Sequence, residues 1–361
     1  MIPQLGAPAI RQAMRWASDE RRLAEACSAV LAFMQRHPIA SSWGRSDLAS
    51  SDMMSLETSK RVWQARVDRR RQTPSIGIYS NVCNWGISYA QPIVLNERQA
   101  GAAIEGVVRD ERLETSQLAV DTHGYTDVAK TLARLLGFDL CPRLKALKDR
   151  HLFVPRGAEV PEAVRSICHA NIDVQAIVTH WESIVHLVAS VHTGHTSAVH
   201  ALARFGSAAR GDPLYEAMVR LGKLLRTVFL ADYFVNATFR RELLRVLNRG
   251  EAVNALKRAI DARRVAGYQA KRHDEMQAVA DALSLLANIL MAWNTAKMPA
   301  VLDQWSTRRS TTVPPVLIGR IAPMRTEGIN LRGVFRFPIE QYADQLLPSL
   351  ATRKSVVGRP G

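Results

Sequence analysis

Three acidic residues that lie far apart in the chain have types and positions suited to metal-dependent phosphodiester chemistry. Asp52 lies beside a run of apolar residues, Asp121 follows the short apolar run 118–120, and Glu251 closes the segment Leu247-Asn248-Arg249-Gly250-Glu251. Such chemistry needs about three carboxylates that hold two Mg²⁺ ions roughly 3.5–4 Å apart, and oxygen ligands suit this metal. The residue types alone leave other acids open as ligands: Asp47, Glu57, Asp127 and Asp139.

Basic residues gather around Glu251 and in one earlier stretch. A carboxylate among cations suits a metal ion that meets a phosphate backbone, so we expect Arg249, Lys257 and Arg258 to neutralise phosphate. The stretch 60–71 is strongly basic and contains Trp63. It has two interpretations, a solvated hairpin edge or a contact with the DNA backbone through Arg69, Arg70 and Arg71.

The composition indicates a folded, basic protein whose partner is a polyanion. The 361 residues are 47% hydrophobic and 22% charged, which is ordinary for a folded chain with a sizeable core. The formal net charge of +15 favours a polyanionic partner, most often nucleic acid. Four cysteines without a CxxC pair indicate neither a zinc site nor a disulfide framework, which fits a reducing cytoplasm. We expect no signal peptide, and the longest apolar stretch, 278–293, is too polar for a membrane span.

Other kinds of site are weaker in the same sequence. His192 and His195 have a spacing that metal ligands use, but no cysteine or acid completes a zinc shell at matching spacing. Ser50-Ser51-Asp52 with His123 lacks the Gly-x-Ser-x-Gly elbow of a serine hydrolase. No phosphate-binding loop of the Walker type occurs, so ATP use is unsupported.

Hydrophobic periodicity predicts a chain that begins as α/β and becomes helical. The segment 40–51 reads as a loop that leads to Asp52. We expect Asn96 and Thr126 to cap helices over 97–109 and 127–136, the second ending at Gly137. Further helices are expected over 8–36, through 161–247, and over 272–297. Strands are expected over 75–82, 86–95, 118–120, 138–141 and 152–154.

Several segments resemble blocks of the Tn3 family of replicative transposases, in the family's order and across roughly residues 35 to 340. The stretch from Trp43 to Asp52 resembles the segment of the first aspartate, and the stretch from Val120 to Asp127 that of the second. Leu247 to Glu251 resembles the catalytic glutamate motif. The remaining matching blocks are Leu135 to Phe138, Pro142 to Leu144, Trp293 to Thr295 and Gly328 to Leu331.

The resemblance implies an Asp-Asp-Glu transposase with Asp52, Asp121 and Glu251 as catalytic residues that hold two Mg²⁺, for which Mn²⁺ can substitute. It implies cleavage at the 3′ ends of a transposon, followed by transfer of those ends to target DNA. The implied partner is double-stranded DNA, both inverted-repeat ends and target, with a homodimer in the full-length form. No membrane partner is expected, and the location would be the bacterial cytoplasm, near the nucleoid.

The implied fold is α/β, with a mixed, ribonuclease-H-like sheet, a large all-helical insertion and flanking helices. We expect a helical lead-in over 1–39, the first part of the core over 40–157, the insertion over 158–246, the second part of the core with the glutamate helix over 247–300, and a basic irregular tail over 301–361.

The chain departs from the family pattern in three places. Asp52 is followed by Met53-Met54-Ser55, where the family commonly has a Gly-x-Arg-Phe-like run. The stretch Asn81 to Trp85 lacks the usual Asp-Gln pair and is one residue short, which could disturb the strand beside Asp52. Family members are far longer, so a fragment, a truncated remnant or one part of a split enzyme is expected. The alternative functions are a catalytically silent DNA-binding remnant and a helical interaction protein without a nucleic-acid role.

Overall fold

A computed structural model describes residues 8, 12, 15–84, 86–110, 114–206, 211–261, 273–327 and 329–330. Its strands are β1 (Leu48–Glu57), β2 (Arg66–Val67), β3 (Pro74–Val82), β4 (Ile87–Ile93), β5 (Gln117–Val120), β6 (Asp139–Pro142), β7 (Leu152–Pro155) and β8 (Cys168–Ile172). Its helices are α2 (Glu20–Gln35), α3 (Ala100–Val108), α4 (Asp127–Leu135), α5 (Val174–Thr179), α6 (Trp181–His192), α7 (Ala198–Ala203), α8 (Pro213–Val235), α9 (Ala237–Asp261), α10 (His273–Arg309) and α11 (Pro315–Ile318), with 3₁₀ turns η1 (Pro38–Trp43), η2 (Leu147–Asp149) and η3 (Glu162–Ile167).

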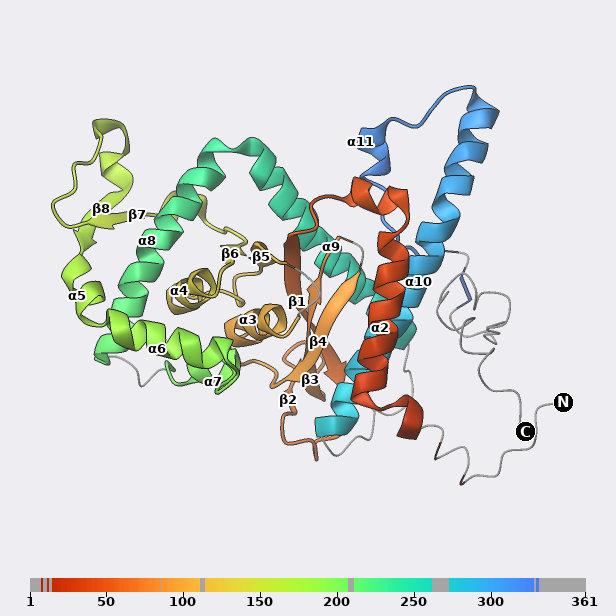
Figure 1. The fold of residues 1–361 in the computed structure, drawn as a ribbon, viewed down its shortest axis with the longest axis horizontal. Helices are drawn as coiled ribbons and strands as arrows, with labels where there is room; N and C mark the ends of the chain where they lie inside the picture. Colours follow the sequence, from red (N-terminus) through yellow and green to blue (C-terminus); the bar gives the residue numbers. More distant parts are fainter. Residues whose placement is uncertain are drawn as a thin grey trace, which may run out of the picture.

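The centre of the fold is a six-stranded mixed sheet (Figure 1). Strand β1 pairs antiparallel with β3 on one side and parallel with β5 on the other. Strands β2 and β4 continue the antiparallel part beyond β3, and β6 continues the parallel part beyond β5. The longest strand, β1, is therefore flanked on both sides, which suits a strand that must hold a side chain rigidly.

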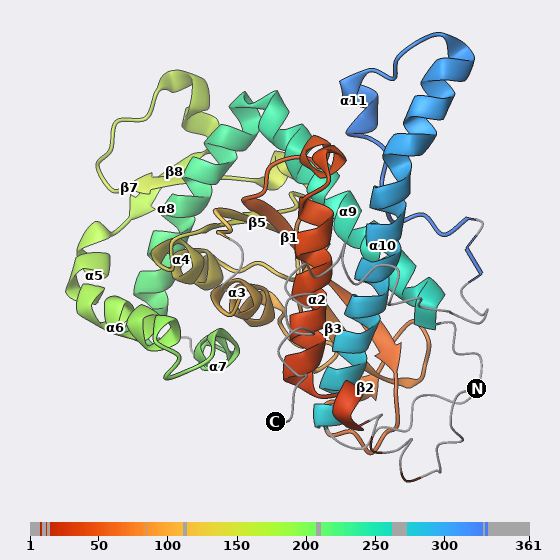
Figure 2. The ribbon, with the colours of Figure 1, turned by 45° about the vertical axis from the view of Figure 1, so that its right-hand side comes forward.

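Helices cover both faces of this sheet. Along β1, Met53 points to a core shared with α3, α4 and α8, whereas Met54 and Leu56 point to a core shared with α2, α9 and α10. This alternation is the period of two that a strand buried on both faces requires. Helices α2 and α10 run side by side on the second face in both views (Figures 1 and 2). Asp52 lies two residues before Met54 on β1, so its side chain points to the same face of the sheet, which α9 covers.

The start and the end of α4 follow its sequence. The Thr126 hydroxyl accepts the backbone N–H of Ala129 at 3.0 Å and satisfies one of the amides left free at a helix start. The helix ends before Gly137, whose φ of 99° is a conformation that glycine adopts readily. The predicted cap and the predicted stop are both confirmed. Asn96 was wrongly expected to cap the preceding helix: α3 begins at Ala100 after Gln99.

The segment between β6 and α9 is the one expected as a helical insertion, and it is called the insertion below. It was expected to be all-helical from 161, but β8 pairs in parallel with β7 in a separate two-stranded sheet. Helices α5, α6 and α7 follow, and the long α8 returns the chain to the main sheet by packing against α4 (Figure 1). The expected boundary at 247 falls inside α9, which runs unbroken from Ala237 to Asp261.

Two other expectations need correction. The segment 40–51 is not a loop, because η1 occupies its start and β1 begins at Leu48, which places Asp52 inside a strand. The tail expected from 301 begins as helix, since α10 continues to Arg309 with Pro299 inside it. The rest of the expected tail, from 331 on, lies outside the described residues.

Helix α10 is long and apolar enough to span a bilayer by length and composition over Glu275–Arg309, and 44% of its most apolar window is buried. Core helices pass the same test. Met276, Ala280, Ala287 and Met291 are fully buried on this helix, in the core that it shares with α2 and the sheet. The helix therefore serves as a core element in this fold.

Candidate active site

Asp52 lies in the middle of β1, opposite Ser80 in the antiparallel register with β3. Its carboxylate is held by two hydrogen bonds: Oδ1 accepts the Met53 N–H at 2.8 Å and Oδ2 accepts the Asn254 side-chain amide at 3.0 Å. The pairing of β1 with β3 runs without a break from Ser50 to Glu57, so the short stretch at Asn81 does not disturb the strand beside Asp52. The irregularity falls on the other side of β3, where the register with β4 shifts between Asn81 and Val82.

Asp121 follows β5, the parallel neighbour of β1. The register pairs Ser51 with Val120, so the next residue on each strand is an aspartate. Parallel strands in register carry consecutive residues side by side, and the carboxyl end of such strands is where α/β sheets place their sites. The Asp121 carboxylate accepts the N–H groups of His123 at 3.0 Å and Gly124 at 2.8 Å, which fixes it in a tight turn.

Glu251 comes from α9, which packs across β1. Its neighbour Gly250 makes the close approach possible, because a Cβ there would lie 3.1 Å from Ser50 Oγ and 3.7 Å from Asp52 Cβ. The Glu251 side chain is 60% exposed and its Oε1 accepts Arg143 Nη1 at 3.0 Å. Arg143 is in turn anchored beside Asp121, since its N–H donates to Val120 O at 2.7 Å.

The three carboxylates interact electrostatically. Burial raises the pKa of Asp52, and the negative charges of Asp121 and Glu251 raise it further, against the Met53 and Asn254 hydrogen bonds. Repulsion of this kind is what a bound cation relieves, and carboxylate oxygens are ligands that divalent hard cations prefer. Within the described part of the chain no three His, Cys, Asp or Glu side chains already form a group that could hold a metal. Glu251 points to Arg143 instead.

Lys257 and Arg249 were expected to face phosphate; the structure buries Lys257 completely and leaves Arg249 partly exposed. Lys257 is fully buried and its Nζ donates to Ser80 Oγ at 2.7 Å. Burial lowers the pKa of Lys257 to about 7, although the charge of Asp52 acts in the opposite direction. Arg249 is mostly covered and donates to Trp43 O at 2.6 Å. Lys257 is buried because of helical spacing, since Gly250, Asn254 and Lys257 form one stripe of α9 that faces the sheet.

The remaining predicted DNA-contact residues are exposed. Arg258 faces solvent on α9, and Arg69, Arg70 and Arg71 form the turn between β2 and β3. This turn is organised by Asp68, a buried residue whose carboxylate accepts the N–H of Arg70 at 2.8 Å and the hydroxyl of Ser55. The nearby Trp63 is 69% exposed. The turn is therefore held in one geometry while its three arginines stay exposed.

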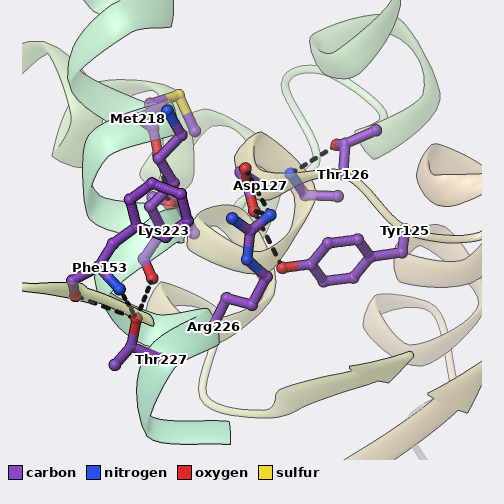
Figure 3. Close-up of polar contacts among 10 residues, drawn as sticks. Tyr125, Thr126, Asp127, Phe153, Met218, Lys223, Arg226 and Thr227 are labelled. Atoms are coloured by element: carbon purple, nitrogen blue, oxygen red, sulfur yellow. Dashed lines mark hydrogen bonds and ion pairs between the residues drawn. The ribbon is translucent and has the colours of Figure 1, made fainter. Parts of the chain in front are cut away.

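A polar network that the sequence did not reveal ties the second-aspartate turn to the insertion (Figure 3). Arg226 of α8 donates to both carboxylate oxygens of Asp127, at 2.9 and 3.1 Å, and the Tyr125 hydroxyl donates to Asp127 Oδ1 at 3.1 Å. Thr227, next on α8, exchanges hydrogen bonds with the backbone of Phe153 on β7. The insertion thus holds the segment that follows Asp121.

The residues of the competing candidate sites lie as follows. His195 Nδ1 lies 2.7 Å from Thr193 Oγ1 in an exposed turn, and among the described residues no metal-holding group contains it. Ser50 is buried under α9, and Ser51, which points to the opposite face of the sheet, is buried as well, so neither hydroxyl is exposed as a nucleophile.

Comparison with known proteins agrees with this geometry. Residues 1–335 match the family described as "Tn3 transposase DDE domain". The chain belongs to the Tn3 transposase family. Proteins of this DDE family generally use divalent metals, as the acidic ligands would require.

Named relatives of the Tn3 family cover the same region. The chain is 72% identical over its whole length to a Comamonas testosteroni protein named "Transposase for insertion sequence element IS1071 in transposon Tn5271", of which it covers 37%. It is 26% identical over 88% of its length to the "Transposase for transposon Tn2501" of Escherichia coli, and 27% identical over 91% to the "Transposase for transposon Tn1546" of Enterococcus faecium. The chain spans about a third of the length of these curated relatives.

Proposed function

We propose that this chain is the catalytic region of a DNA transposase that cleaves the 3′ ends of a transposon and transfers them to target DNA. The observation that carries the proposal is the convergence of three elements. The proposal is supported by the β1–β5 register, in which Asp52 and Asp121 come next after a paired position, and by the close packing of Gly250, the neighbour of Glu251 on α9, against β1. Three carboxylates from two strands and a helix are what two-metal phosphodiester chemistry needs.

The residues fit a pair of Mg²⁺ ions, with Mn²⁺ as a substitute, held by Asp52, Asp121 and Glu251. When bound, such ions activate the attacking water or hydroxyl and stabilise the leaving oxygen. Asn254 orients the carboxylate of Asp52, and the N–H groups of His123 and Gly124 orient that of Asp121. Arg143 binds Glu251, so Glu251 would act as a metal ligand only after leaving this partner.

The proposed fold type is ribonuclease-H-like. In its support, β4, β3 and β1 form an antiparallel run that continues as the parallel strands β5 and β6. Residues from the central strand and its parallel neighbour then meet a helix that returns after an insertion. This arrangement explains why the acids lie so far apart in the chain.

The proposed partner is double-stranded DNA, as transposon ends and as target. Its contact residues on this chain are Arg258 and the turn Arg69-Arg70-Arg71, all exposed. Dimerisation and a cytoplasmic, nucleoid-associated location are proposed for the longer protein only.

A second function is favoured by one specific observation, the Arg143–Glu251 ion pair that keeps the third acid from the other two. If that arrangement persists with metal present, the chain is a DNA-binding remnant without cleavage activity.

The test combines metal binding with strand nicking. We expect Mn²⁺ to raise the Tm of the wild-type chain, and to support nicking of a duplex that carries a transposon end. Asp52→Asn and Glu251→Gln should lose both effects, whereas Asp303→Asn, an exposed acid on α10, should keep them. An equal Mn²⁺ response in wild type and Asp52→Asn would refute the metal site. Salt-sensitive DNA binding without any metal response would establish the remnant.

A further inference from the structure

Two arginines on α9 share one side of the helix, upstream of Glu251. Arg245 and Arg249 are four residues apart, which places them one above the other. Arg249 Nη2 donates to Trp43 O at 2.6 Å. The guanidinium of Arg245 lies against Gly44, where any side chain would collide with it. Both arginines therefore point toward the turn that joins η1 to β1.

That turn is built to receive them. Gly44 has a φ of 121°, which strains any other residue. Its carbonyl accepts the Asn84 side-chain amide at 3.0 Å, which fixes the turn to the end of β3. Both arginine side chains are only partly exposed. The Arg249 guanidinium is therefore fixed by the turn, and that of Arg245 lies beside it at a partly open surface.

The pair is electrostatically incomplete. Burial and the positive charge of Arg245 together lower the pKa of Arg249 to about 10. No ion pair in the described part of the chain involves either arginine, and the buried Nε of Arg245 has no hydrogen-bond partner there. Two adjacent, partly buried cations without a counter-charge destabilise a fold unless an anion joins them. The Trp43 carbonyl accounts for Arg249 but leaves Arg245 without a structural reason.

We propose that Arg245 and Arg249 form a phosphate-binding site that holds one backbone phosphate of the bound DNA. This inference rests on the proposed function. The planar guanidinium fork suits bidentate recognition of phosphate oxygens. Arg245 precedes Glu251 by six residues, which is about 9 Å along a helix. The proposed phosphate site therefore lies on the same helix as Glu251, on the side that faces the turn between η1 and β1.

The test uses Arg245→Gln, because Arg249 also ties Trp43 to the helix. Inorganic phosphate is the probe, compared with chloride at equal ionic strength. We expect phosphate to raise the Tm of the wild-type chain and of Arg308→Gln, an exposed arginine on α10, but not of Arg245→Gln. Without phosphate, Arg245→Gln should be as stable as wild type or more so, because the repulsion with Arg249 is gone.

A second readout is binding of a 30-base-pair duplex without divalent metal. Arg245→Gln should bind about tenfold more weakly and lower the salt dependence of log K by about one. The same losses in Arg308→Gln would show a general charge effect and overturn the site. A drop in the Tm of Arg245→Gln with an unchanged phosphate response would also overturn it and give Arg245 a structural role.

The two hypotheses fail separately. If wild type shows no metal response but Arg245→Gln loses the phosphate response, the catalytic proposal fails and the phosphate site stands. If Asp52→Asn loses the metal-induced rise in Tm but Arg245→Gln keeps the phosphate-induced rise, only the phosphate site fails.

Discussion

At the scale of single residues, burial decides what each charged group does. Asp281 of α10, which is not one of the three candidate acids, is an example of this effect. Its Oδ1 accepts the Gln277 amide at 3.0 Å, while its buried Oδ2 has no partner among the described residues. Burial raises the pKa of Asp281 to about 6, and the charge of Glu20 adds to that shift. A carboxylate in such a place is more stable protonated than charged.

Asp281 therefore predicts a pH dependence of stability. Because its folded pKa lies above the model-peptide value of 3.8, its stabilising contribution is complete below that value and is lost as pH rises through about 6. Asp281→Asn removes this loss. We expect the variant to gain up to about 2–3 kcal/mol over wild type at pH 8 relative to pH 4, from about 1.4 kcal/mol per pKa unit. Urea unfolding at both pH values measures it, and parallel pH curves for the two proteins would contradict it.

At the scale of elements, two helices must approach others closely for the acidic site to exist. α9 does so at Gly250 over β1, and α8 does so at Gly222 over the start of α4. The second contact supports the Arg226–Asp127 ion pair, in which both partners are largely buried. Since Asp127 begins the helix after the second-aspartate turn, α8 acts on Asp121 by fixing the chain that follows it.

Gly222→Ala tests this coupling. A Cβ at this position would collide with the backbone of Asp127, so α8 and α4 must move apart. We expect a loss of about 1–3 kcal/mol in stability, the usual cost of overpacking, and a weaker Mn²⁺-induced rise in Tm. Gly206→Ala is the matched control, because its Cβ would meet Ala203 O at an ordinary 3.4 Å. A stable variant with a normal metal response would show that α8 does not position the turn.

At the scale of the whole molecule, the net charge of +15 is the property that most favours DNA. Exposure divides those cations into groups with different roles. Lys257 is fully buried and Arg249 is partly exposed, whereas Arg258 and the turn from Arg69 to Arg71 face solvent. Only exposed cations can replace counterions on a duplex, so the number of basic residues overstates the contacts.

The salt dependence of duplex binding should show whether the turn Arg69-Arg70-Arg71 contacts DNA phosphates. Replacing Arg69, Arg70 and Arg71 together by Gln should lower the slope of log K against log salt by about 2–3, at about 0.9 per phosphate contact. The Tm should hardly change, because these side chains are exposed. Fluorescence anisotropy at several salt concentrations measures the slope. An unchanged slope would show that the turn does not contact DNA and is only a solvated edge of the hairpin.

The sequence by itself determined the local elements and the acids. Alternating apolar residues predicted β3 and β4, the Thr126 cap and Gly137 predicted α4, and the run 118–120 predicted β5 before Asp121. The spacing of Gly250, Asn254 and Lys257 on one helical face was a signal that could have predicted the burial of Lys257. These patterns are local, because each depends on residues within two turns or one strand.

Only the tertiary structure decided which segments meet. The sequence did not show that β8 pairs with β7 or that Arg143 binds Glu251. It also did not show that Arg245 and Arg249 lie close enough for the charge of one to lower the pKa of the other. Periodicity indicates which face of an element is buried but not which distant element covers it. Which distant element covers a face decides whether a charged side chain is buried and which partner it has. The chemistry of the acidic site therefore depends on the tertiary structure.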